Sequence, residues 1–121
     1  MPHTILEYSA NLPGAEELRP LWQKLHPALA ATAPCRIQDI KSRAYPCDPF
    51  WVGDGDPGNS FAHLTIRMLE GRAPENLARV GEAALGVLME HFAEAWRGGR
   101  CALTVELAGM RKDSYFKAIQ T

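Results

Sequence analysis

The sequence predicts an α+β domain in which two β-α-β units form a four-stranded mixed sheet with two helices on one face. Four short runs alternate apolar and polar residues, as half-buried strands do. Two longer segments carry apolar residues at spacings of three and four, as amphipathic helices do. Because 121 residues can bury one modest core, residues 1–121 are predicted to form a single domain.

The first unit begins almost at the chain start, with a predicted strand over His3–Ser9. A helix is predicted from the apolar spacing between Leu18 and Leu29, with Pro20 tolerable in its first turn. Pro27 lies inside this pattern and is expected to kink the helix or create a local defect. A second strand is expected from Arg36 to Tyr45.

The second unit follows a long loop from Pro46 to Ser60 that is dense in turn-forming residues. The first strand of this unit is predicted over Phe61–Leu69. The apolar side of this strand is expected to be covered by a helix. One continuous helix is expected from Pro74 to the Gly98-Gly99 stop signal. A last strand begins at Cys101, before a polar tail at 111–121. The apolar side of the Phe61–Leu69 strand consists of Ala62, Leu64, Ile66 and Met68.

Charge and composition exclude several classes of partner. Thirteen basic and 14 acidic residues give a net charge of −1 without a block of like charges, so no nucleic-acid partner is expected. No apolar run approaches the roughly 20 residues that span a bilayer, so we expect no membrane partner and a cytoplasmic location. Three widely spaced cysteines fit neither a disulfide framework nor a zinc site, and reduced thiols are expected.

Familiar metal and cofactor motifs are missing from the sequence. The Asp54-Gly-Asp56 segment resembles the start of a calcium loop, but its twelfth position is Thr65 where a bidentate Glu is needed. The four histidines show no ligand spacing. Gly-x-Ser-x-Gly, phosphate-loop and dinucleotide motifs do not occur. We therefore expect no metal and no cofactor.

The chain start itself could carry chemistry. Proline in second position can simply set φ before an edge strand, and composition alone favours that reading. Removal of Met1, however, would leave Pro2 with a free amine, and an α-amino group titrates near about pH 8. Burial or nearby cations would lower this pKa toward neutrality, where a general base works best. The pyrrolidine ring would fix the direction of the nitrogen.

Cations lie on elements that could surround such a base. Lys41 and Arg43 share one face of the expected second strand, and Arg72 follows Gly71 after the third. These cations could bind the carboxylates of an acidic substrate and stabilise a dienolate. Taken alone, without Pro2, each is better explained as a solvated surface charge. Two helices cover only one face of the sheet, so self-association is the economical cover for the other.

Several segments resemble, in order and at nearly constant offset, the 5-carboxymethyl-2-hydroxymuconate isomerase family of the tautomerase superfamily. The resemblance covers about the first 110 residues. The segments that carry it are Pro2-His3, Glu7-Tyr8-Ser9, Pro27–Thr32, Ile40–Arg43, Asp54-Gly55, Phe61–Thr65, Gly71-Arg72 and His91-Phe92-Ala93.

This resemblance implies the fold of 4-oxalocrotonate tautomerase and macrophage migration inhibitory factor, built from β-α-β units in a homotrimer. It implies cofactor-free conversion of 5-carboxymethyl-2-hydroxymuconate to its 2-oxo-3-ene isomer, in homoprotocatechuate (4-hydroxyphenylacetate) catabolism. Pro2 matches the catalytic proline and Arg72 a substrate-binding arginine. Where the family has Arg-Ser-Arg, this chain has Lys41-Ser42-Arg43, so a planar fork becomes a point charge at Lys41.

Two other hypotheses stay open at this point. A non-catalytic trimeric member could bind a small acid or a protein through the same pocket without turnover. An active enzyme could instead act on another 2-hydroxydienoate or on a phenylpyruvate-like enol.

Overall fold

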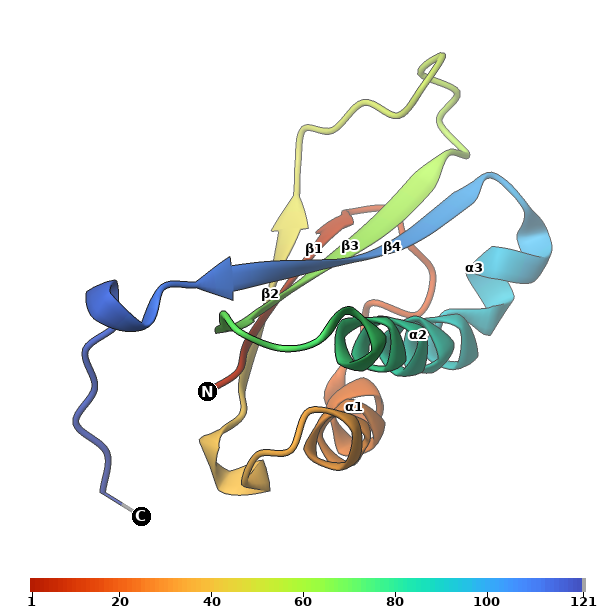
Figure 1. Cartoon of the computed structure of the whole chain (residues 1–121). Coiled ribbons are helices and arrows are strands. Elements are labelled where there is room, and N and C mark those ends of the chain that lie inside the picture. The colour runs from red at the N-terminus through yellow and green to blue at the C-terminus, as the bar shows by residue number, and fades with distance from the viewer. Residues whose placement is uncertain (121) are drawn as a thin grey trace.

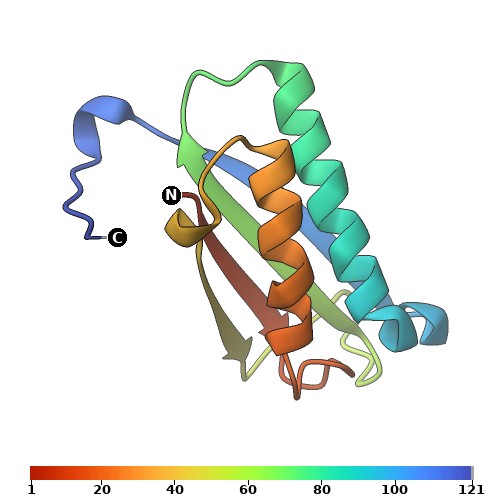
Figure 2. The same ribbon diagram turned by 90° about the horizontal axis from the view of Figure 1, so that it is seen from below.

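A computed structural model describes residues 1–120 and contains one four-stranded sheet with strand order β2-β1-β3-β4 (Figure 1). Helices α1 and α2 lie on one face of this sheet, as Figure 2 shows. The predicted α+β fold is confirmed. The elements are β1 (His3–Ser9), α1 (Arg19–Thr32), η1 (Ile37–Asp39), β2 (Lys41–Cys47), β3 (Ser60–Leu69), α2 (Pro74–His91), α3 (Ala93–Gly98), β4 (Cys101–Met110) and η2 (Lys112–Ser114).

The strand pairing makes the two halves of the chain equivalent. β1 pairs with β2 and β3 pairs with β4, both in parallel, while the central strands β1 and β3 are antiparallel. Each half is therefore a β-α-β unit, and the two units meet at the β1–β3 pair. At the chain start, His3 lies between Lys41 on β2 and Arg67 on β3. This register decides which charged side chains become neighbours.

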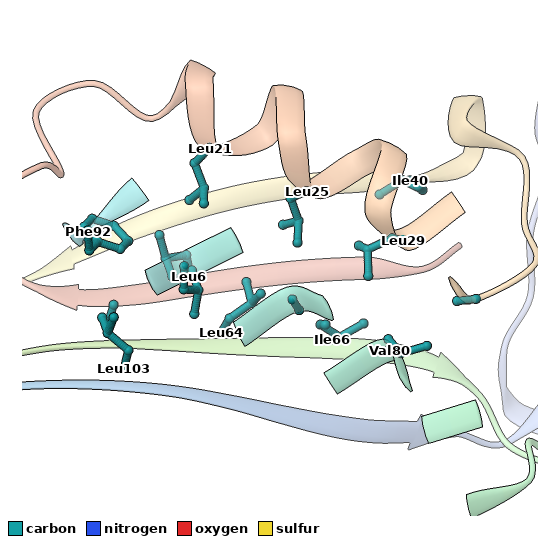
Figure 3. Packing of buried hydrophobic residues seen from close by; sticks show 14 of the residues in the cluster. Leu6, Leu21, Leu25, Leu29, Ile40, Leu64, Ile66, Val80, Phe92 and Leu103 are labelled. Carbon is teal, nitrogen blue, oxygen red and sulfur yellow. The ribbon is translucent and has the colours of Figure 1, made fainter. Parts of the chain in front are cut away.

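The core lies between the sheet and the two helices (Figure 3). α1 presents its leucines to β1 and β3, and α2 extends the same layer over β4, which is why helical and two-residue periodicities converge on one cluster. The predicted apolar side of β3 is buried as expected. Fully buried members of the cluster include Leu6, Leu21, Leu25, Leu29, Leu64, Ile66, Val80, Leu88 and Phe92.

None of the helices α1, α2 and α3 covers the opposite face of the sheet (Figure 1). It mixes apolar, charged and aromatic side chains, including Ile5, His63 and Tyr45, and the ring of Tyr45 is 56% exposed. We call this surface the open face. Its mixed character differs from the apolar helix-covered face.

The second strand begins at Lys41, so the prediction of a strand from Arg36 was wrong. Residues 37–39 form a short 3-10 turn instead, and Asp39 N–H donates to the Arg36 carbonyl at 2.9 Å. The physical reason is the position of the partner strand. β1 starts at His3, opposite Lys41, and offers no strand partner to the residues before it.

The predicted helix from Pro74 to Gly98 is broken at Phe92, which separates α2 from α3. The Phe92 ring is fully buried and packs beside Gly14, and His91 Nε2 lies 2.9 Å from the Gly14 carbonyl. These tertiary contacts redirect a chain whose apolar spacing continues without interruption. Gly99 ends α3 at φ +78°, in agreement with the predicted stop signal. α1, by contrast, continues through Pro27 to Thr32.

Candidate active site

The chain start is fixed between β2 and the turn before it. Pro2 is fully buried, and its carbonyl accepts a hydrogen bond from the Lys41 backbone N–H at 3.2 Å. The Met1 amine donates to the Asp39 carbonyl at 2.7 Å, and Lys41 Nζ donates to the same oxygen at 3.0 Å. The structure thus brings Pro2 and Lys41 together. While Met1 is present, the Pro2 nitrogen belongs to an amide and has no basic lone pair.

The environment of the chain start disfavours positive charge. The pKa of the Met1 amine is lowered from 8.0, first by burial and then by the Lys41 ammonium, with Asp39 acting in the opposite direction. Pro2 is the next residue and is more deeply buried, so the same two causes would act on its amine after Met1 is removed. This environment suits a base that is neutral near physiological pH.

Arg43 forms part of a hydrogen-bonded cluster on the open face. Its Nη1 and Nη2 atoms lie 3.1 and 3.2 Å from His3 Nδ1, and His3 Nε2 lies 3.0 Å from the Tyr115 hydroxyl. A guanidinium can only donate, so Nδ1 must be the acceptor and the imidazole hydrogen resides on Nε2. Burial and the Arg43 charge lower the pKa of His3, which is consistent with this neutral form.

Arg72 occupies the loop between β3 and α2 and is held by an asparagine. Its Nη1 donates to Asn76 Oδ1 at 3.3 Å, while Asn76 Nδ2 donates to the Thr32 carbonyl at the end of α1, at 2.8 Å. Because the bond to the Thr32 carbonyl requires the amide nitrogen of Asn76, the amide oxygen is the atom that faces Arg72. Arg72 is therefore anchored to both helices of the fold.

Cys35 connects Arg72 electrostatically to the chain start. Burial raises the pKa of its thiol, whereas the Arg72 guanidinium and the Met1 amine both act to lower it. Both cations are therefore close enough to the same sulfur to affect its ionisation. Of the four predicted residues, Pro2, Lys41 and Arg43 form one group, and Arg72 approaches from the helix side.

A cavity of about 180 Å³ lies beside Arg72, between the ends of β3 and β4 and the start of α2. Its apolar wall includes Met68, Leu77 and Leu107, and its charged lining residues are Glu70 and Arg72. An apolar pocket with few polar groups suits a small organic acid, since the guanidinium can orient a carboxylate while the walls hold the carbon chain.

Three further features bear on the site. Within residues 1–120, no three His, Cys, Asp or Glu side chains gather as metal ligands. His63 on the open face contacts Thr104 Oγ1 at 2.7 Å and Glu106 Oε1 at 3.0 Å. No helix in this part of the chain is long and apolar enough to cross a membrane.

The sequence pattern does not identify His3 and Asn76 as partners of Arg43 and Arg72, nor Tyr115 as a partner of His3. Arg67 is a further neighbour of this cluster, and only the β1–β3 register shows that it lies beside His3. No local signal links the tail residue Tyr115 to His3, 112 positions earlier.

Comparison with known proteins shows which family this chain resembles. The family model described as 5-carboxymethyl-2-hydroxymuconate isomerase matches residues 2–120. The 5-carboxymethyl-2-hydroxymuconate Delta-isomerase of Escherichia coli is 31% identical over 117 residues, which cover 97% of this chain and 93% of that protein.

Solved structures agree with this family and its fold. A 5-carboxymethyl-2-hydroxymuconate isomerase from Deinococcus radiodurans R1 superposes with a TM-score of 0.89 at 30% identity, covering 98% of this chain and 90% of that one. A structure described as a fused 4-OT wild type symmetric trimer shares the fold, with a TM-score of 0.72 at 15% identity over 96% and 91% of the two chains. With the family match extending over residues 2–120, this chain belongs to the 5-carboxymethyl-2-hydroxymuconate isomerase family and has its tautomerase fold.

Proposed function

We propose that this protein is a 5-carboxymethyl-2-hydroxymuconate delta-isomerase of homoprotocatechuate catabolism, with the Pro2 amine as its general base. The observation that carries this proposal is the buried position of Pro2 beside Lys41, where burial and the Lys41 charge lower the pKa of the adjacent Met1 amine. The names of the Escherichia coli and Deinococcus radiodurans relatives support the substrate.

The reaction moves one proton along a conjugated dienol. The Pro2 nitrogen removes the proton from the 2-hydroxyl group, the C2–O bond becomes a carbonyl, and the double bonds shift to C3–C4. The same nitrogen then returns the proton to C5, so the base is regenerated. General acid–base catalysis by one positioned group contributes about 10² to 10⁴ in rate.

The cations would bind and stabilise the anionic intermediate. Lys41 and Arg43 lie on the open-face side of Pro2, and Arg72 lies on the helix side beside the apolar cavity. Negative charge that develops on the dienolate oxygen would be stabilised by these fixed charges, in a site that is already oriented before substrate arrives. The asparagine contact of Arg72 would maintain this orientation.

We further propose that the protein is a homo-oligomer, with a trimer as the expected state. The uncovered open face supports association, because exposed Tyr45 and half-buried Ile5 lie on it and no α-helix within residues 1–120 covers it (Figure 1). A structure of the same fold is described as a symmetric trimer. The cytoplasmic location stays a prediction.

The experiment is a comparison of Pro2→Ala with the unaltered protein, following the ultraviolet absorbance of the dienol. Intact mass first establishes that Met1 is absent from both proteins. We expect kcat/KM to fall by about 10² or more in Pro2→Ala, since the rigid secondary amine is lost. The matched control is Pro57→Ala in the loop before β3, which should keep full activity. Equal rates for the unaltered protein and Pro2→Ala would exclude the role of Pro2.

A further inference from the structure

Three cationic side chains, Lys41, Arg43 and Arg67, lie around His3 at one end of the open face; we call these four residues the row. Lys41, His3 and Arg67 are direct neighbours on β2, β1 and β3, and the charges of Lys41, Arg43 and Arg67 all act on the His3 imidazole. Like charges on neighbouring strands destabilise a sheet. Among residues 1–120, no carboxylate forms a hydrogen bond or an ion pair with Lys41, Arg43 or Arg67. Such an arrangement is suited to an external anion.

The Tyr115 hydroxyl adds a directed donor to this row. Because His3 donates from Nε2 to the Tyr115 oxygen, the phenolic hydrogen is not used in that bond. It is available to a second acceptor. The Arg43 contact with Nδ1 sets this direction, so His3 acts as a positioning residue for Tyr115.

Arg67 and Tyr115 line one cavity of about 270 Å³ between the end of β4 and the C-terminal tail. Its other polar side chains are Arg111 and Ser114. Arg111 is already paired with Asp113, at 2.6 Å between Nη2 and Oδ2, so Arg67 is the lining cation that has no carboxylate partner within residues 1–120. Figures 1 and 2 show the tail running from the end of β4 on the N-terminal side of the sheet.

We infer that Arg67 and Tyr115 form a second carboxylate subsite, which selects acids that carry two carboxylates at one end. This inference rests on the proposed function and deepens it. In 5-carboxymethyl-2-hydroxymuconate, C5 bears both a carboxylate and a carboxymethyl group, whereas C1 is a single carboxylate. The doubly charged end faces the row of Lys41, Arg43 and Arg67, and the C1 carboxylate faces Arg72. A simple 2-hydroxydienoate diacid leaves the Arg67–Tyr115 subsite empty.

The test compares two substrates in Arg67→Gln and Tyr115→Phe. One substrate is 5-carboxymethyl-2-hydroxymuconate, and the other is 2-hydroxymuconate, which lacks the carboxymethyl group. We expect KM for the first to rise about tenfold or more in Arg67→Gln and less in Tyr115→Phe, because charge-assisted hydrogen bonds are lost. KM for 2-hydroxymuconate should change less than twofold in both variants, with kcat retained. Arg97→Gln, on exposed α3, is the matched control.

Equal losses for both substrates, or unchanged KM for both, would overturn the inference. Calorimetric binding of tricarballylate and glutarate gives a readout that needs no turnover. Wild-type protein should prefer tricarballylate, and Arg67→Gln should lose that preference while keeping its affinity for glutarate. If the wild type isomerises neither 5-carboxymethyl-2-hydroxymuconate nor 2-hydroxymuconate, the proposed function fails. The calorimetry with tricarballylate and glutarate still decides whether Arg67 binds the additional carboxylate. Retained preference in Arg67→Gln contradicts the subsite.

Discussion

The two β-α-β halves share an architecture but differ in whether the cation near the start of their strands has a carboxylate partner. In the second half, Arg100 stands just before β4, and its carbonyl accepts from Ser60 N–H at 2.9 Å. In the first half, the Pro2 carbonyl accepts from Lys41 N–H at 3.2 Å, at the matching end of β1 and β2. Arg100 forms an ion pair with Asp56 at 2.8 Å. Lys41 has no carboxylate partner within residues 1–120.

Under the proposed function, this difference separates a structural charge, Arg100, from a substrate-binding charge, Lys41. The 48–59 loop closes over the start of the second half and supplies Asp56 as a counter-ion, whereas the chain itself starts at the corresponding place in the first half. In the proposed function, the Pro2 amine at the first place is the base, and the cations around it bind the substrate. Exposed ion pairs such as Arg100–Asp56 contribute only about 0–1 kcal/mol, so the pairing mainly removes an unneeded charge.

The largest expected effect tests whether the halves are equivalent in their cores. Leu25 of α1 and Leu88 of α2 are both fully buried against the sheet. Leu25→Ala and Leu88→Ala should each lower the free energy of unfolding by about 2–5 kcal/mol, through lost burial and a new cavity. Urea denaturation measures both. A large loss for one leucine and almost none for the other would show that the halves are not equivalent in packing.

The next prediction tests whether the cations of the two halves, Lys41 and Arg100, have different roles. Lys41→Ala should lower kcat/KM for the dienol by about 10- to 100-fold, because a cation that stabilises the intermediate is lost. Arg100→Ala should leave kcat/KM within twofold and change the unfolding free energy by less than about 1 kcal/mol. Steady-state kinetics of the two variants provide the comparison. Similar losses of activity in both would remove the distinction between the halves.

A smaller effect concerns pH and is confined to the first half. The pKa values of His3 and His26 are lowered from 6.5, in both cases chiefly by burial. The unfolded chain therefore takes up these protons first, so stability is fully present above about pH 6.5 and falls as pH drops through the lower folded values. His26→Gln should flatten part of this fall in urea midpoints between pH 7.5 and 5. An unchanged slope would contradict the assignment to His26.

Periodicity and turn residues predicted the strands and helices that build the core. β1 and β3 were predicted almost to the residue, because alternation along them reflects burial on one face. The break at Phe92 was not predictable, since it depends on contacts with Gly14 rather than on local spacing. The start of β2 depends on where its partner begins, which no window of sequence contains.

The candidate site divides in the same way. Pro2, Lys41, Arg43 and Arg72 could be proposed because their residue types suit proton transfer on an acidic substrate. The partners that position them come from elsewhere in the chain. Tyr115 reaches His3 from the tail. The Arg72 contact with Asn76 matters because Asn76, on α2, also donates to the Thr32 carbonyl at the end of α1. Long-range register and packing determine these contacts.

The central claim is that a free Pro2 amine is the base, and blocking that amine tests it most directly. A protein with one additional residue retained before Pro2 keeps every side chain but converts the nitrogen to an amide. Intact mass establishes the two N-termini, and kcat/KM for the dienol is measured from pH 5 to 9. We predict that the free-amine form shows an acid limb whose pKa lies below that of an unperturbed α-amino group, and that the blocked form loses nearly all activity. Equal activity in the two forms would contradict the account.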